Sequence, residues 1–226
     1  PNTKVFDLKS GNEINQMRQA GKNVALTQIV LASANRIGIS TFQLDQIAEN
    51  EIRTKGAIPS FKGYMGFPSS ICTSINNEIV HGIPSKRKIQ NGDIISIDVG
   101  AIYNGYHSDS AFTIGVGDIS DQAKKLILDT KTALQIGINS AIDSARVGDI
   151  GFSIQKYGDQ YNYGIVKQYV GHGIGRNLHE EPQIPNYGIR GKGVQLKNGM
   201  SIAIEPMFNL GSWETNVLED NWTVVT

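Results

Sequence analysis

Two carboxylates in the first half of this chain are spaced so that they could bind one cation. Asp98 and Asp109 lie on either side of Asn104-Gly105, the strongest two-residue signal for a β-hairpin turn. With that turn, Gly100 lies opposite Asp109 and Asp98 lies opposite Ala111, so the two aspartates are diagonal neighbours on one face, roughly 7–8 Å apart. Carboxylates buried at that range repel, and a divalent metal ion between them removes the cost.

The second half of the chain offers two further metal donors. The alternative explanation for Asp98 and Asp109 is that they are ordinary polar residues on a solvated sheet face. Glu205 occupies the equivalent position of an internal repeat within an apolar run, where a solvated face would not require an acid. His172 lies between two glycines, which let another backbone approach closely and leave the imidazole free. Three carboxylates and one imidazole are ligands suited to Mn, Fe, Co or Zn. They do not resemble the thiolate ligands of a structural zinc site.

These donors belong to an internal repeat. Residues 88–98 and 195–205 both contain an Asn-Gly turn followed by an apolar run that ends in an acid, at an offset of 107 residues. Two other sets recur in the same order: Arg36, Gly38 and Phe42 as Arg146, Gly148 and Phe152, and His81-Gly82-Ile83 as His172-Gly173-Ile174. We therefore predict two similar α+β halves, approximately residues 10–115 and 120–226, within one domain.

Helix caps and apolar spacing predict the elements that position the donors. A capping box at Ser10–Glu13 begins a helix that runs to Gly38, and Ser40 begins a second helix, with Phe42 on its apolar side, that ends at Gly56. The third and fourth helices are expected to begin at Ser120-Asp121 and Arg146-Val147-Gly148, and Ile71–Ile83 reads as a strand that ends in a loop.

The composition argues against several classes of function. The 226 residues include 21 basic and 21 acidic side chains, and this zero net charge does not steer the protein toward nucleic acid or an anionic membrane. Cys72 is the single cysteine, so no internal disulfide is possible. The sequence has neither a signal segment nor an apolar run of about 20 residues. We expect a soluble cytoplasmic protein that needs neither nucleic acid nor a membrane.

Motifs over nearly the whole chain resemble those of the type I methionine aminopeptidases, which have the pita-bread fold. The motifs are Ser74–Pro84, Ile97–Gly100, Gly105–Asp109, Gly171–Gly175, Leu178–Pro182 and Ile204–Met207. The resemblance implies a single catalytic α+β domain over residues 1–226, with a curved antiparallel sheet covered by helices and two halves related by a pseudo-twofold. It also implies a monomeric, cytoplasmic hydrolase with two divalent metal ions (Co, Mn, Fe or Zn). Its substrates would be nascent polypeptides at the ribosome, from which a metal-activated water releases the initiator methionine.

The same resemblance implies a role for each site residue. The metal ligands would be Asp98, Asp109, His172 and Glu205, and the catalytic residues would be His81, His179 and Glu205. The pocket for the methionine side chain would be formed by Phe61, Tyr64, Phe67, Cys72, Leu178 and Trp222. The alternative explanation is that both histidines are ordinary hydrogen-bonded loop residues and that the pocket residues belong to the core. Pocket and core explain Phe61 and Leu178 about equally, whereas the pocket is favoured for Tyr64 and Trp222.

One ligand of the resembled family has no counterpart here. In that family a fifth ligand, a glutamate that bridges both metals, comes from a final strand, and the segment Asp220–Thr226 resembles the residues that precede this strand. Asp220 is not a substitute, because Trp222 aligns with the tryptophan that borders the family's substrate pocket. Two explanations follow: the sequence is shortened, or the protein binds metal with an incomplete ligand set and is weakly active or inactive.

Two other functions stay open for a pita-bread sequence. The first is a catalytically inactive binding protein, against which the four metal donors argue. The second is an Xaa-Pro aminopeptidase-like enzyme, which carries an additional N-terminal domain, whereas the first predicted helix begins here by Ser10. The type II methionine enzymes carry an insertion in the second half, and only 33 positions separate His172 from Glu205.

Overall fold

The computed structural model describes residues 6–226, which fold into two compact units, each built from two segments of the chain. Met17–Leu128 and Glu214–Thr226 form the unit that we call the first-half unit. Asp129–Trp213 and the residues up to Gln16 form the second-half unit. Each unit therefore contains a segment from the opposite end of the sequence, and the units are not simply the two successive repeats.

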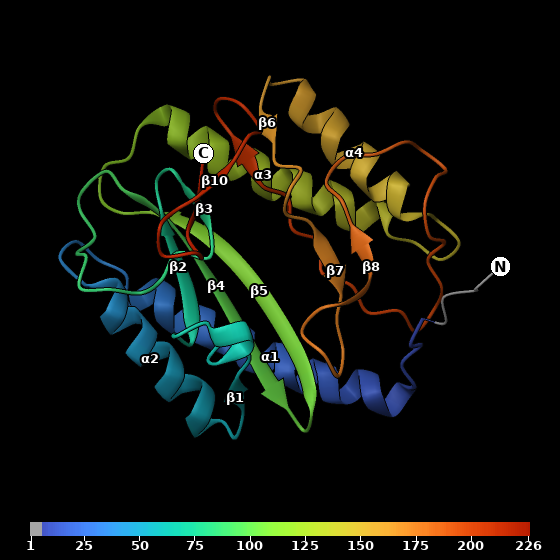
Figure 1. Ribbon diagram of the computed structural model, residues 1–226, viewed down its shortest axis with the longest axis horizontal. Helices are drawn as coiled ribbons and strands as arrows, with labels where there is room; N and C mark the ends of the chain where they lie inside the picture. Colours follow the sequence, from blue (N-terminus) through green and yellow to red (C-terminus); the bar gives the residue numbers. More distant parts are fainter. Residues whose placement is uncertain (1–5) are drawn as a thin grey trace. The chain divides into compact units, whose positions relative to one another are not determined.

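A long hairpin forms the centre of the first-half unit. Strands β4 (Ile94–Tyr103) and β5 (Tyr106–Gly115) are antiparallel and are joined at Asn104-Gly105. β4 also pairs with β2 (Ile71–Ile75) and with the two-residue strand β1 (Ile58–Pro59) (Figure 1). The predicted register is confirmed, because Tyr103 pairs with Tyr106 and Gly100 pairs with Asp109.

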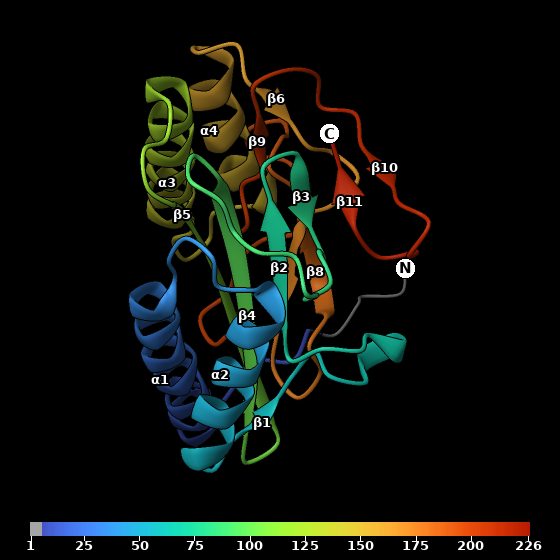
Figure 2. The same cartoon turned by 90° about the vertical axis from the view of Figure 1, so that its left-hand side faces the viewer.

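Two helices cover one face of this sheet, as Figure 2 shows: α1 (Gly11–Ala34) and α2 (Thr41–Thr54). Their apolar side chains pack against alternate residues of β4. The buried cluster includes Val24, Leu31, Leu44, Ala48, Ile52, Ile71, Ile95, Ile97, Val99 and Ala101. Because successive strand residues point to opposite faces, Asp98 lies on the face of β4 that the helices do not cover.

Local sequence explains where α2 begins, and the structure corrects two predictions for this region. Ser40 and Gln43 form the predicted capping box. The preceding helix is shorter than predicted, because α1 ends at Ala34 while Gly38 adopts a positive φ of 86° in the connecting turn. The side chain of Phe42 is 48% exposed, so its place in the apolar stripe was predicted wrongly. The first turn of α2 projects this ring beyond the core.

The predicted strand over Ile71–Ile83 is in fact two short strands that belong to different sheets. β2 ends at Ile75, and β3 (Glu78–Val80) follows a turn in which Asn76 has a positive φ of 57°. Asparagine tolerates this conformation better than most residues, which the prediction overlooked. β3 pairs with β11 (Val224–Val225), and β11 pairs with β10 (Asn216–Val217), so the C-terminal segment completes this small sheet.

The second-half unit contains α4 (Val147–Asp159) and four short strands. The strands are β6 (Gly164–Ile165), β7 (Gly171–Gly173), β8 (Glu180–Ile184) and β9 (Phe208–Asn209), and they pair as β6 with β9 and β7 with β8. α3 spans Asp121–Ser140, so the third and fourth helices both begin where the sequence predicted. Among residues 6–226, no helix is both long enough and apolar enough to cross a membrane.

The second copy of the predicted acidic strand is not a regular strand. The segment that precedes Glu205 makes one bridge, between Ile202 and Gly173, and two backbone hydrogen bonds between Ala203 and His172. β7 provides only three residues for pairing, which is too short for a regular ladder along this segment. The repeat therefore predicted the length of this strand wrongly.

Candidate metal centre and catalytic site

The two aspartates lie on the uncovered face of the β4–β5 hairpin. Asp98 pairs with Ala111 and Asp109 with Gly100, which makes the aspartates diagonal neighbours as predicted. The same face carries a hydrogen bond of 2.7 Å between the hydroxyl groups of Ser96 and Thr113. Polar groups therefore continue along this face, while the opposite face is apolar core.

Gly100 gives Phe61 its position beside this face. A Cβ atom at Gly100 would lie 2.6 Å from Cε1 of the Phe61 ring and 2.8 Å from Cβ of Ser60. The Phe61 side chain therefore packs directly on the β4 backbone, at the residue that pairs with Asp109. Phe61 is 7% exposed, so packing accounts for its burial whether or not it also borders a substrate.

In the second-half unit, close backbone packing positions His172. A Cβ atom at Gly171 would lie 2.2 Å from the carbonyl oxygen of Ala203, and one at Gly173 would lie 2.3 Å from that of Glu181. Only glycine fits at such distances. The two glycines thus allow β7 to pack closely against the backbone at Ala203 and at Glu181. This packing fixes the backbone of His172, which lies between the two glycines.

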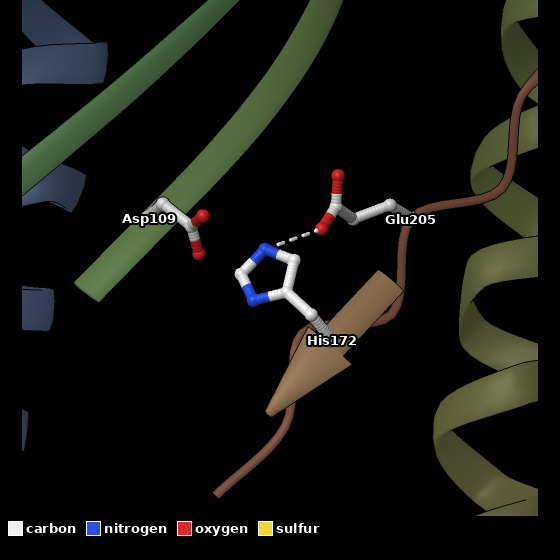
Figure 3. Close-up of side chains that lie close together, drawn as sticks. All are labelled: Asp109, His172 and Glu205. Carbon is white, nitrogen blue, oxygen red and sulfur yellow. Dashed lines mark ion pairs between the residues drawn. The ribbon is translucent and has the colours of Figure 1, made fainter. Parts of the chain in front are cut away.

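The hydrogen bonds of His172 suit a metal ligand. Its Nδ1 donates to the carbonyl oxygen of Gly173 at 2.8 Å, and its Nε2 lies 3.0 Å from Oε1 of Glu205. Figure 3 draws this ion pair as a dashed line, with Asp109 of β5 also labelled. A metal-bound histidine commonly donates its other ring N–H to a carbonyl group, which fixes the ring. The amide of Asn186, a fully buried residue, holds the carbonyl group of Glu205 at 2.7 Å.

His179 lies beside His172. Their rings meet edge to face, with centroids 4.3 Å apart and an interplanar angle of 82°. His179 is exposed, whereas its neighbour Leu178 is only 3% exposed. His172, His179 and Glu205 therefore form one cluster in the second-half unit, and the side chain of His179 is accessible to a substrate.

The first-half unit groups His81 with two predicted pocket residues. The Trp222 ring lies edge to face with Phe67, at a centroid distance of 5.0 Å, and its centroid is 6.4 Å from that of His81. Burial lowers the pKa of His81, so its imidazole is neutral at neutral pH. His81 also adopts a positive φ of 61°, a conformation that is uncommon for residues other than glycine.

Asp220 stabilises the turn that carries Trp222. Its Oδ1 accepts hydrogen bonds from the backbone N–H groups of Trp222 and Thr223, at 2.9 and 2.8 Å. Burial raises the pKa of Asp220, but the hydrogen bonds from Thr223 and Trp222 outweigh this effect and leave the pKa below its usual value. Its carboxylate thus has a structural role in the turn.

Cys72 pairs with Asp98 across β2 and β4. Burial and, to a smaller extent, the charge of Asp98 raise the pKa of its thiol well above the usual value. The sulfur is therefore a neutral thiol, which suits a packed side chain and excludes a thiolate nucleophile.

Tyr64, another predicted pocket residue, is partly exposed and lies in the 3₁₀ turn Tyr64–Gly66.

Known proteins are similar to this chain over nearly its whole length. Residues 15–226 match metallopeptidase family M24. "Methionine aminopeptidase 1" of Bacillus subtilis (strain 168) is 54% identical over 218 residues, which cover 96% of this chain and 88% of the relative. The methionine aminopeptidase of Clostridium acetobutylicum is 50% identical over 220 residues, covering 97% and 88%. The crystal structure of the enzyme from Rickettsia prowazekii has a TM-score of 0.97 at 40% identity, covering 98% of this chain and 90% of that one. The expected α+β pita-bread fold is confirmed.

Proposed function

Because this chain belongs to metallopeptidase family M24, we propose that it binds divalent metal through Asp98, Asp109, His172 and Glu205 and cleaves methionine from peptide N-termini. Its identity to methionine aminopeptidases over most of its length makes it a metal-dependent hydrolase of that type. An inactive binding protein and an Xaa-Pro aminopeptidase are not favoured, since the relatives above are all methionine aminopeptidases.

The observation that carries the ligand assignment is the orientation of His172. Because Nδ1 donates to the Gly173 carbonyl group, the ring offers Nε2 to the side of Glu205, where a cation would bind both side chains. Asp109, His172 and Glu205 each offer one ligand atom. Carboxylate oxygens and an imidazole nitrogen suit Mn, Fe, Co or Zn, so these residues fit the metal that the family requires.

We infer two ions per chain, as in the resembled family. When bound, they supply Lewis-acid polarisation of the scissile carbonyl group and lower the pKa of a water molecule toward about 7. The residues of the protein supply the remaining functions. Glu205 has a second carboxylate oxygen, which takes the proton of the attacking water and delivers it to the leaving amine.

The two loop histidines act on the substrate peptide. His179 is exposed beside His172 and contacts the scissile amide, so that it stabilises the tetrahedral intermediate. His81 is neutral at neutral pH because burial lowers its pKa, and it can therefore both donate and accept a hydrogen bond. It therefore acts as a hydrogen-bond or proton-transfer partner of the substrate.

The methionine side chain occupies an apolar pocket. Phe67 and Trp222 form its edge-to-face wall, and Cys72 provides a small uncharged thiol. Phe61, Tyr64 and Leu178 complete the set that the family motifs indicate. Apolar side chains of similar size differ by only about 1–3 kcal/mol in such a pocket, so selectivity for methionine over leucine on shape alone is modest.

We further propose that the protein acts in the cytoplasm, as a monomeric single catalytic domain, on nascent chains at the ribosome. Its one cysteine suits a reducing compartment, where disulfides are rare. The nascent N-terminus is the substrate that an enzyme for initiator methionine meets first.

Release of methionine from a Met-Gly-containing tripeptide, with Co or Mn titrated in, tests the function. Asp109→Asn and His172→Ala should each lower the rate by more than the roughly 10–100-fold that loss of an outer-shell partner costs. Asp121→Asn is the control, because that carboxylate is 99% exposed at the start of α3. Calorimetry should count two ions per chain. Equal rates for Asp109→Asn and Asp121→Asn, or no metal binding, would contradict the assignment.

A further inference from the structure

A buried lysine near the start of the chain contacts the loop that carries His179. We propose that Lys9 is a positioning residue for His179, acting through its ion pair with Glu180. This inference rests on the role proposed above for His179. It gives Lys9 a role in the reaction, although this residue lies outside the motifs that contain the proposed metal ligands.

The Lys9–Glu180 pair is short and almost completely removed from solvent. Nζ of Lys9 lies 2.6 Å from Oε2 of Glu180, and the two side chains are 2% and 14% exposed. The backbone N–H of Lys9 donates to the carbonyl oxygen of Gly199 at 2.8 Å, which fixes the base of the side chain. A second acid, Asp7, lies 3.3 Å from Nζ but is 58% exposed. Glu180 is therefore the partner whose charge depends on Lys9.

Gly175 provides the space for this pair. A Cβ atom at Gly175 would lie 2.5 Å from Cε of Lys9, 2.6 Å from its Nζ and 2.9 Å from Oε1 of Glu180. The last glycine of Gly171–Gly175 is thus explained by a lysine that is far away in the sequence. The lysine fills the space where a side chain would otherwise be.

Glu180 connects this pair to both ends of the loop. Its Oε1 accepts a hydrogen bond from the backbone N–H of Asn177 at 3.0 Å, while its own backbone pairs with Gly173. Leu178 and His179 are the two residues between these anchors. The ring of His179 lies 4.3 Å from that of His172, so movement of the loop changes the distance between the two imidazoles.

Loss of the ammonium group leaves the Glu180 carboxylate buried without its cation. A buried charge that loses its partner must move toward water or take up a proton. Either change releases the Asn177 anchor or moves the Glu180 backbone, and both displace His179. A displacement of about 1 Å at a group that contacts the reacting atoms can cost about 100-fold in rate.

A second ion pair on the same loop provides the matched control. Arg176 lies 3.5 Å from Oε1 of Glu13, but its side chain is 60% exposed. Exposed pairs of this kind contribute little to stability. Arg176→Met therefore removes a cation from the same loop, together with its ion pair to Glu13 of the N-terminal segment, without leaving a buried charge.

The kinetic test is a double-mutant cycle. Lys9→Met should lower kcat by about 10–100-fold with a smaller change in KM, and Arg176→Met should change kcat by less than about 3-fold. In a His179→Ala background, Lys9→Met should have almost no further effect on kcat, because the residue that it positions is gone. An equal loss in both backgrounds would overturn the proposal, since a purely structural role lowers activity whether or not His179 is present.

A spectroscopic test does not depend on activity. The chain has four histidines, so the ring resonances of His179 and His107 can be assigned by substitution and followed by NMR. Lys9→Met should shift the His179 resonances and leave those of His107, on β5, unchanged. Glu180→Gln keeps the volume and removes the charge, and it should shift the same resonances if Lys9→Met does not fold. Unmoved His179 resonances in a folded variant would refute the positioning role, whereas a protein that releases no methionine would contradict only the proposed function.

Discussion

Replacement of Gly173 by alanine tests how closely β7 must approach β8. The added Cβ atom would lie 2.3 Å from the carbonyl oxygen of Glu181 and 2.8 Å from its carbonyl carbon, and both atoms belong to the backbone. Ordinary contact begins near 3.4 Å, so the two strands must separate by about 1 Å. The side chain at risk is that of the neighbouring residue, His172.

The strain predicts two separable losses. Overpacking of this kind costs about 1–3 kcal/mol of unfolding free energy, and for a chain of this size each kcal/mol lowers Tm by roughly 2–4 °C. A shift of about 1 Å in a metal ligand should also weaken metal binding and lower kcat by up to about 100-fold. Metal affinity should therefore fall more than the loss of stability alone explains.

Thermal unfolding of the metal-free protein, calorimetry with Mn and hydrolysis of a methionine tripeptide measure the three quantities. Gly211→Ala is the matched control, because a Cβ atom there has no neighbour within 4 Å. The control should change the unfolding free energy by less than about 0.5 kcal/mol. If Gly173→Ala and Gly211→Ala have the same Tm and the same metal affinity, close packing does not position His172.

Three further predictions concern the first-half unit. Because burial raises its pKa, native Cys72 should react with iodoacetamide at pH 8 far more slowly than the unfolded chain does, and equal rates would contradict its burial. The pKa of His81 is lowered on folding, so the unfolded state takes up the proton first as pH falls below about 6.5. Urea unfolding should therefore show stability decreasing from pH 7 to pH 5, less so in His81→Asn, and parallel profiles would contradict this. Asp220→Ala should lower the unfolding free energy by about 1–2 kcal/mol and raise the exposure of Trp222 to a fluorescence quencher, whereas an unchanged midpoint would show that the turn does not need the carboxylate.

The parts of the structure that local sequence specifies were predicted well. The Asn104-Gly105 turn fixed every pair in the β4–β5 hairpin, because a two-residue loop allows one register. The capping box at Ser40 likewise fixed the start of α2. The face shared by Asp98 and Asp109 follows from the register alone.

The remaining features depend on contacts between segments that are distant in the sequence. Lys9 and Asn186 belong to no motif, and only the folded chain shows that one pairs with Glu180 and the other holds the carbonyl group of Glu205. Neither has a signal in its neighbouring residues. Phe42 has the helical spacing of a core residue, and only the folded chain shows that it is 48% exposed.

The pairing of β3 with β11 has a consequence for synthesis of the chain. Val80 pairs with Val224, so 144 residues must be added after Val80 before its partner exists. At about 5–20 residues per second, this edge is open for roughly 7–30 s. Open strand edges template aggregation, and short length and charge are the usual protection. β3 has only three residues and begins with Glu78, so the growing chain carries an edge that is poorly suited to capture by another copy.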